Sequence, residues 1–260
     1  MKHSRAALAL AAVACLSTST LAQQQRDIFG LWTRGGAANT LFRPPQSGTG
    51  PVMTLPGQNV PRQAGDYNSP ILQPWAKEVV RRQTELVLAQ DRALNTPQEM
   101  CWPMGVPHIL QLNFHAYIID DGKKITFLYE RHNQRRTARL NSSHPATVKT
   151  SWFGDSVAHW EGDTLVVDTV GLDPRTWVDV FATPHTDKLH VVERYRLRDK
   201  DNLDVTIEVD DPGTFTTKWS AMVTYTKDDD PWLETICSEN NIDAATGKLY
   251  DQPMATKPDF

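Results

Sequence analysis

A stretch of alternating apolar and ionisable residues, 151–172 (SWFGDSVAHWEGDTLVVDTVGL), predicts a β-hairpin that carries a histidine and several acids. A two-residue turn at Gly162-Asp163 would put His159 and Asp168 on one face as diagonal neighbours. A carboxylate beside an imidazole fixes its tautomer and raises its basicity, as a general base requires. We therefore predict that His159 and Asp168 form a catalytic acid–base pair if this face lines the protein interior. A three-residue turn would separate them.

A second polar segment, residues 129–136 (YERHNQRR), lies at the end of a predicted strand. In a barrel, alternate side chains face the lumen, so about half of these residues would line a cavity. We predict that Arg135 or Arg136 holds a carboxylate or phenolate of the substrate, and that Tyr129 and Glu130 contribute to its binding. The alternative interpretation is a solvated turn with salt bridges.

A third segment, residues 184–195, brings two histidines and a glutamate close together in sequence. His185, His190 and Glu193 have the ligand types of a divalent metal site. His190 and Glu193 are three apart on a predicted strand and so point to opposite faces, which argues against that site. We expect no metal, and we assign His190 and Glu193 to substrate binding together with Trp160 and Trp219.

Other common chemistries have no signature in the chain. There is no phosphate loop, no Gly-x-Gly-x-x-Gly motif and no Gly-x-Ser-x-Gly motif, so we expect no cofactor and no serine nucleophile. A net charge of −4 gives no argument for nucleic acid or for an acidic membrane surface as a partner. A small molecule is the partner that we expect, and the oligomeric state is left open.

The elements that must position these residues are mostly strands. Short apolar runs separated by turn residues predict strands at 116–119, 125–130, 135–140, in the hairpin 151–172, and at 190–198, 203–209, 215–226 and 233–237. Sequential hairpins at this spacing favour a mainly β, antiparallel fold, either an up-and-down barrel or a strongly curved sheet.

The chain before these strands differs in composition. Residues 42–70 are rich in Pro, Gly, Gln and Ser and predict an extended arm. One helix is predicted at 74–94, with Trp75, Val79, Leu86 and Ala93 as its apolar stripe. We divide the chain into residues 1–22 as signal peptide, 23–100 as an arm and helix packed on the barrel, 101–241 as the barrel domain, and 242–260 as a polar tail.

The N-terminus has the order of a Sec signal peptide, with basic residues, then an apolar run, then a peptidase site that predicts cleavage after Ala22. Lipidation at Cys15 is the alternative. No later segment is a candidate membrane span, so we expect a periplasmic or secreted protein. Export leaves only Cys101 and Cys237, and an even pair in an oxidising compartment predicts a disulfide. Two buried free thiols are the alternative.

The chain contains, in order, the motifs YERHNQRR, HP, SWFGDSVAHWEGDTLVVDTVGL and PHTDKLHVVERYR, and then a DDP turn followed by Trp. With these motifs it resembles a large family of exported bacterial proteins, mostly of unassigned function. The resemblance covers about residues 101–241. It implies a lipocalin-like (calycin-type) barrel with a polar cavity, which agrees with the Gly-x-Trp at Gly30 and Trp32. It implies no catalytic residue.

The leading hypothesis from the sequence is an exported enzyme that carries out cofactor-independent acid–base chemistry on a small, partly apolar, aromatic or phenolic molecule. A lyase, a decarboxylase or an isomerase fits such a site. Two alternatives stay open. The first is a non-catalytic carrier of a hydrophobic ligand, which predicts an apolar lumen with the ionisable residues outside. The second is a metal-dependent enzyme that uses His185 and His190.

Overall fold

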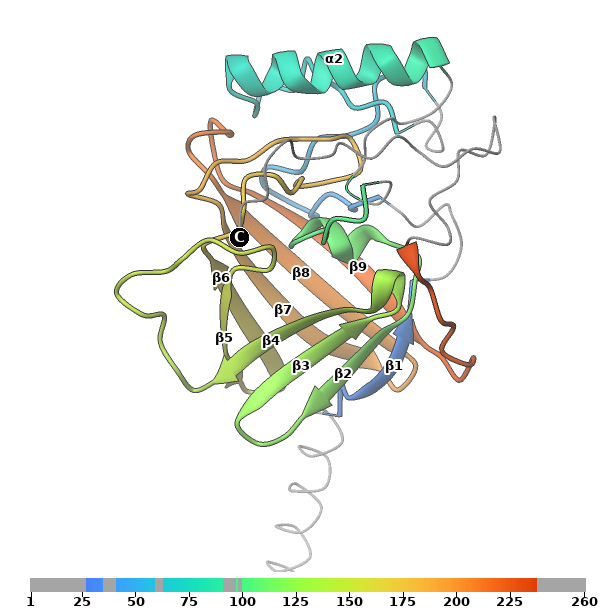
Figure 1. The fold of residues 1–260 in the computed structure, drawn as a ribbon, viewed down its shortest axis with the longest axis vertical. Helices are drawn as coiled ribbons and strands as arrows, with labels where there is room; N and C mark the ends of the chain where they lie inside the picture. Colours follow the sequence, from blue (N-terminus) through green and yellow to red (C-terminus); the bar gives the residue numbers. More distant parts are fainter. Residues whose placement is uncertain (1–26, 35–40, 59–62, 91–96, 98–99, 238–260) are drawn as a thin grey trace, which may run out of the picture.

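The protein folds around a closed barrel of nine strands (Figure 1). The structure is a computed structural model that describes residues 27–34, 41–58, 63–90, 97 and 100–237. The predicted signal peptide, residues 1–22, and the predicted tail, residues 242–260, lie outside the described residues. The strands are β1 Gly30–Thr33, β2 Ala116–Asp120, β3 Lys124–Tyr129, β4 Gln134–Leu140, β5 Asp155–Glu161, β6 Thr164–Val170, β7 His190–Asp199, β8 Asn202–Asp210 and β9 Trp219–Lys227.

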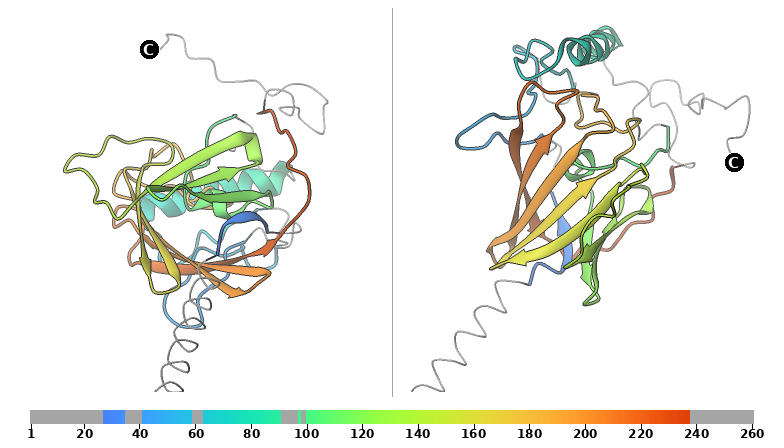
Figure 2. Two further views of the ribbon diagram at one scale, coloured as in Figure 1. Left: turned by 90° about the horizontal axis from the view of Figure 1, so that it is seen from below. Right: turned by 90° about the vertical axis from the view of Figure 1, so that its left-hand side faces the viewer.

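The strands follow one another around the barrel in chain order, and β1 closes it by pairing with both β2 and β9. All neighbouring pairs among the nine strands are antiparallel except β4 and β5, which are parallel. The loop 141–154 makes this exception, because it returns the chain to the starting end of β4 before β5 begins (Figure 2). The predicted mainly β, lipocalin-like barrel is confirmed, with this one parallel pair.

Side chains alternate along each strand between the lumen and the outer face. On β8, for example, Leu203, Val205, Ile207 and Val209 are fully buried, whereas the residues between them are partly or fully exposed. Each such buried aliphatic side chain contributes about 1.5 to 3 kcal/mol of transfer free energy. The same alternation decides which polar residues face the core and which face solvent.

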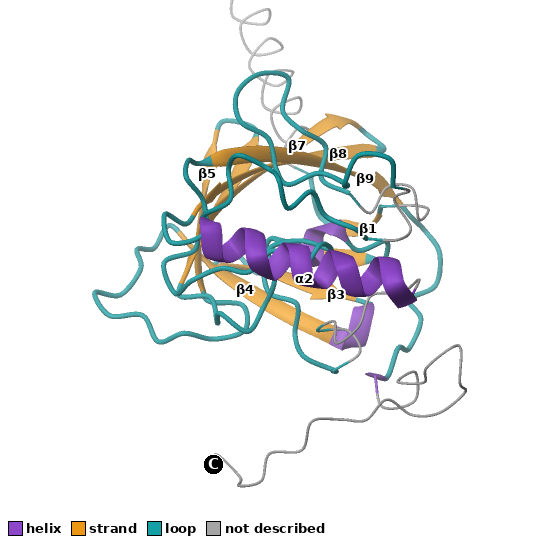
Figure 3. Cartoon of the chain, turned by 90° about the horizontal axis from the view of Figure 1, so that it is seen from above, coloured by secondary structure: helices purple, strands orange, loops and turns teal. Residues whose placement is uncertain are grey.

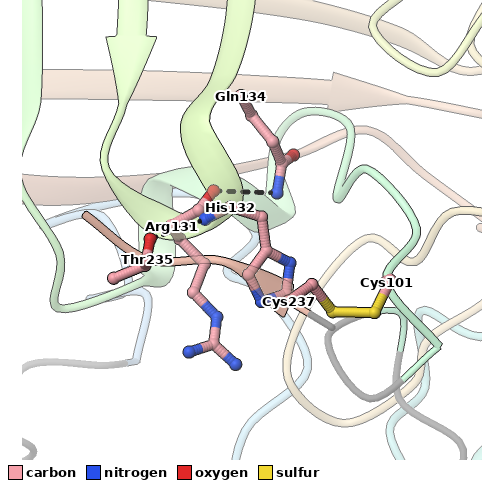
Figure 4. Close-up of a disulfide and its surroundings, with 6 residues drawn as sticks. All are labelled: Cys101, Arg131, His132, Gln134, Thr235 and Cys237. Carbon is pink, nitrogen blue, oxygen red and sulfur yellow. Dashed lines mark hydrogen bonds between the residues drawn. A yellow bond between two sulfur atoms is a disulfide. The ribbon is translucent and has the colours of Figure 1, made fainter. Parts of the chain in front are cut away.

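Two of the predicted strands differ in the structure. The strand expected from Phe215 begins only at Trp219, because residues 211–218 form the connection from β8. The segment 233–237 is not a strand. It runs beside the 3-10 turn η4 (Arg131–Asn133), where the backbone N–H of His132 donates to Thr235, and the Cys101–Cys237 disulfide fixes its end (Figure 4). The predicted disulfide is therefore confirmed.

Helix α2 (Pro74–Gln90) crosses one end of the barrel, above the extended arm (Figure 3). Its buried face consists of Ala76, Val80, Thr84 and Val87, and Trp75, Val79 and Leu86 are exposed. The predicted stripe is therefore wrong for those three residues; Ala93 lies outside the described residues. Close packing selects the smaller side chains, because Thr84 exchanges hydrogen bonds with the backbone of Gly65 in the arm.

The chain between the arm and β2 closes this end of the barrel. A short 3-10 helix, η3 (His108–Gln111), inserts there, and the carbonyl of Leu110 accepts hydrogen bonds from Arg34 (3.0 Å) and from the Tyr225 hydroxyl (3.3 Å). Phe42 and Val52 of the arm join the same hydrophobic core. Arm and barrel thus share a core. Among the described residues, no helix is long and apolar enough to cross a membrane.

Candidate functional site

The hairpin of β5 and β6 has the predicted two-residue turn. Glu161 pairs with Thr164, and Val157 pairs with Asp168. His159 and Asp168 therefore lie on the same face of the hairpin, as the sequence predicted.

That face is the outside of the barrel. Ala158 and Val167, on the opposite face, are buried in the core, whereas the side chain of His159 is 49% exposed and its Nε2 lies 3.1 Å from Glu161. The condition that this face lines the interior is therefore not met, because Ala158 and Val167 on the opposite face occupy the lumen. The side chains that contact Asp168 come from other segments of the chain.

Two histidines from different segments meet at Asp168. Nε2 of His144, in the loop 141–154, lies 3.0 Å from Oδ1 of Asp168, and Nε2 of His190, the first residue of β7, lies 2.9 Å from the same oxygen. An ionised carboxylate only accepts hydrogen bonds, so both imidazoles donate to it through Nε2. We call His144, Asp168 and His190 the outer cluster.

His144 is held from its other side as well. Its Nδ1 lies 2.6 Å from Oδ1 of Asp155, the first residue of β5, and Arg139 of β4 binds the Asp155 carboxylate with two hydrogen bonds of 2.6 and 3.0 Å. The hydrogen bonds from Arg139, assisted by that from His144, hold the pKa of Asp155 below its ordinary value. With carboxylates on both nitrogens, His144 is suited to orient Asp168 rather than to exchange protons with a ligand.

The backbone fixes the loop that carries His144. The N–H of Asn141 donates to the carbonyl of Ala158 (2.7 Å), and the N–H of Ser151 donates to that of Gly171 (3.0 Å). Gly154 has φ +65°, and a Cβ there would lie 2.4 Å from the carbonyl oxygen of Val170. The loop is thus held at both ends against β5 and the end of β6, which brings His144 within reach of Asp155 and Asp168.

His190 has the geometry of a general base. Within the described part of the chain, its ring makes one hydrogen bond, from Nε2 to Asp168, so Nδ1 is available, and the side chain is 38% exposed. The hydrogen bond to Asp168 raises the pKa of His190 above its ordinary value of 6.5. Burial alone would raise the pKa of Asp168, but hydrogen bonds from His190 and His144 bring it below its ordinary value. An imidazole oriented in this way by a carboxylate can take and return a proton near neutral pH.

A positive charge lies beside His190 on the same outer surface. Asp210 at the end of β8 pairs with His190 in the strand register, and Lys218 forms an ion pair with Asp210 at 3.0 Å. The Lys218 side chain is 61% exposed, and an exposed ion pair contributes little, so Lys218 can exchange Asp210 for an anionic group of a ligand, unlike a cation in a buried pair.

The two predicted arginines face opposite ways. Arg135 is exposed on the outer face of β4. Arg136 points into the lumen, where it forms a bidentate ion pair with Glu193 (2.5 and 3.1 Å), and the Tyr195 hydroxyl donates to the same carboxylate (2.8 Å). Glu193 already neutralises Arg136, so the structure does not support the idea that Arg136 binds a substrate anion.

The remaining predicted residues do not gather at one place. Tyr129 and Trp219 are buried in the barrel core, Trp160 packs edge-on against Phe29, and Glu130 accepts hydrogen bonds from His115. A cavity beside Tyr129 has about 10 Å³, close to the least that holds one water molecule. It is lined by Trp32, Leu110, Ala116, Ile118, Phe127, Tyr129, Tyr195, Leu203 and Tyr225.

The two histidines of the metal alternative have separate partners. His185 is buried between the Thr176 hydroxyl (2.7 Å) and the Thr186 carbonyl (2.8 Å), while His190 contacts Asp168. Among the described residues, one group of three possible metal ligands has its ligand atoms all within 4.8 Å of one another. It consists of His115, Asp228 and Asp230. The outer cluster is therefore a hydrogen-bonded relay rather than a preformed metal cage.

Sequence reasoning missed His144 and its partner Asp155 as members of the site. The one signal for His144 was the His-Pro pair in a polar loop, which carries no periodicity and so no indication of what it faces. His190 was assigned to substrate binding, and its contact with Asp168 depends on the pairing of β6 with β7. Compared with known proteins, the chain matches no protein-family model and no curated protein.

Proposed function

We propose that this protein is an enzyme that catalyses cofactor-independent proton transfer, with His190 as its general base and acid and Asp168 as the group that orients it. The hydrogen bond between His190 Nε2 and Asp168, which leaves Nδ1 exposed, is the observation that carries the proposal. Such a pair suits a lyase, a decarboxylase or an isomerase, in which one group removes a proton and later returns it.

His144 is a positioning residue in this proposal. Its Nε2 contacts the same Asp168 oxygen as His190 does, and Asp155 with Arg139 fixes the orientation of its ring. Each contact in this relay reduces the rotational freedom of the next, so the carboxylate is already aimed at His190 before a substrate arrives.

The substrate that we propose is a small, partly apolar molecule with an anionic group, such as an aromatic acid or a phenol. Lys218 supports the anionic group, since its exposed ammonium lies on the surface next to His190. Lys218 thus takes the role of holding the anionic group, which the sequence analysis assigned to Arg135 or Arg136. The aromatic character remains a proposal from the sequence.

We propose that the protein acts in the periplasm or outside the cell. The signal-like sequence of residues 1–22 and the Cys101–Cys237 disulfide support this location, because disulfides persist in oxidising compartments.

A lipocalin-like carrier fits the structure less well. It accounts for the exposure of His159 on the outer face. A carrier, however, needs room in the lumen, and this lumen contains a buried Arg136–Glu193 ion pair and, beside Tyr129, a cavity of only about 10 Å³.

The test compares three variants on a panel of aromatic and phenolic acids, with products of decarboxylation, isomerisation and elimination followed by mass spectrometry. His190→Gln and Asp168→Asn should each lower turnover at least a hundredfold, the usual contribution of a positioned acid or base. His159→Gln is the matched control on the same outer surface and should keep wild-type turnover. Equal turnover by His190→Gln and wild type, or no product from the wild type across the panel, would refute the proposal.

A further inference from the structure

A second cluster of ionisable residues lies where the barrel is closed by its shortest strand. β1 has four residues, and only two of them pair with β9. Both Ala116, at the start of β2, and Lys227, at the end of β9, pair with Trp32 of β1. The residues just beyond these positions therefore come together. They are His115, Asp228 and Asp230, and we call them the seam cluster.

We propose that the seam cluster binds a divalent transition-metal ion of the Zn²⁺ or Mn²⁺ type, which ties the start of β2 to the chain after β9. One imidazole nitrogen and two carboxylate oxygens, one atom from each residue, all lie within 4.8 Å of one another. A mixed set of nitrogen and oxygen donors suits these ions better than Ca²⁺, which takes six to eight oxygens.

The orientation of His115 supports the site independently of the two aspartates. Its Nδ1 lies 2.6 Å from Oε2 of Glu130, so its Nε2 is the nitrogen that faces Asp228, at 3.2 Å. Glu130 is itself buried and fixed, because it accepts hydrogen bonds from the backbone N–H groups of His115 (3.1 Å) and Leu233 (3.0 Å). A buried carboxylate on the far nitrogen of a histidine is the usual arrangement around a protein-bound metal, since it fixes the ring and makes the ligand nitrogen more basic.

The charge of the seam cluster also favours a cation. Within the described part of the chain, no lysine or arginine forms an ion pair with Asp228 or Asp230, and Asp229 between them adds a third carboxylate. The Asp230 backbone N–H donates to Oδ1 of Asp228 (2.9 Å), which turns the chain so that both side chains approach His115.

An orphaned polar group lies beside the seam cluster. His115, Tyr129 and Arg131 are among the residues that line one cavity of about 10 Å³, and Asp228 and Asp230 do not line it. Tyr129 is 3% exposed, and its hydroxyl has no hydrogen-bond partner among the described residues. A buried hydroxyl without a partner is costly, so a water molecule in this cavity, next to the ligand residue His115, would satisfy it.

The experiment measures binding to the untagged full chain after removal of metals with a chelator. Isothermal titration with Zn²⁺ and, separately, with Mn²⁺ should show one ion per chain for the seam cluster. Asp230→Asn should weaken this binding at least about tenfold, because it removes one of three protein ligands from an exposed position where the fold does not depend on it. Asp229→Asn is the matched control, since it removes the same charge one residue away and should bind as the wild type does.

Two further measurements keep the result specific. His190→Gln should leave the affinity unchanged, which separates the seam cluster from the proposed catalytic residues. The ion should also raise the midpoint of thermal unfolding for the wild type and for Asp229→Asn, and not for Asp230→Asn, because an ion bound only to the folded state stabilises it. Equal affinities for the two asparagine variants, no binding of Zn²⁺ or Mn²⁺ at millimolar concentration, or binding of Ca²⁺ alone would overturn the inference.

Discussion

The ion pair inside the barrel makes the sharpest prediction about stability. Arg136 and Glu193 have side chains that are 1% and 0% exposed, and their two hydrogen bonds are 2.5 and 3.1 Å long. Glu193→Gln keeps the shape of the side chain and an acceptor for the Tyr195 hydroxyl, but it removes the negative charge. The guanidinium is then left in the core with no counter-charge, apart from the face of Phe127 at 4.5 Å.

Removing one partner of a buried pair costs about 3 to 5 kcal/mol, because the remaining charge stays desolvated. For a chain of this size, 1 kcal/mol shifts the unfolding midpoint by about 2 to 4 °C, so the midpoint of Glu193→Gln should fall by about 6 to 20 °C. Adding Arg136→Met should restore most of this loss, since the double variant has no unpaired charge and methionine fills a similar volume.

Urea unfolding followed by tryptophan fluorescence, with the disulfide intact, measures these free energies. The reasoning fails if Glu193→Gln loses less than about 1 kcal/mol, or if the double variant is less stable than Glu193→Gln alone. Either result would mean that the guanidinium finds solvent or another partner in the barrel.

Four further predictions concern the outer cluster, the disulfide and the loop 141–154. Asp168→Asn should lower the pKa of His190, as measured by NMR, because it removes the hydrogen bond to an anion that raises it; an unchanged pKa would contradict the assignment. In the wild type this pair stabilises the fold most between the ordinary pKa values of Asp and His, about 3.9 and 6.5. The contribution is lost as the pH falls through the lowered pKa of Asp168 or rises through the raised pKa of His190, so the stability difference from Asp168→Asn should shrink in both directions. Cys237→Ser should cost about 4 to 5 kcal/mol in chemical denaturation, since the disulfide spans 136 residues and restricts the unfolded chain; a loss below about 1 kcal/mol would show that the unfolded chain is already restricted. Gly154→Ala should destabilise more than Gly162→Ala, although both residues have φ near +65°, because only at Gly154 would the new Cβ meet a backbone carbonyl; equal losses of about 1 kcal/mol would attribute both to backbone strain alone.

The local pattern of the sequence was sufficient for most of the barrel. The alternation in residues 203–209 marks a strand with one face in the core, and Gly162-Asp163 marks a two-residue turn, and both depend only on neighbouring residues. The pattern failed for helix α2, where Ala76 and Thr84 face the core and Trp75 does not. Size and hydropathy do not reveal that the arm backbone approaches the helix closely at Gly65.

By itself, the sequence determined that His159 and Asp168 share a face if the turn has two residues, because the register of a hairpin follows from its turn. Only the tertiary structure decided that this face is the outside and that Asp168 contacts His144 and His190. The contact with His190 depends on how β6 pairs with β7, and the contact with His144 depends on where the loop 141–154 leads back to β5. Both contacts join residues that are more than twenty positions apart in the sequence. The periodicity of a segment contains no information about which strands pair, whereas closure of the barrel determines the neighbours of every strand together.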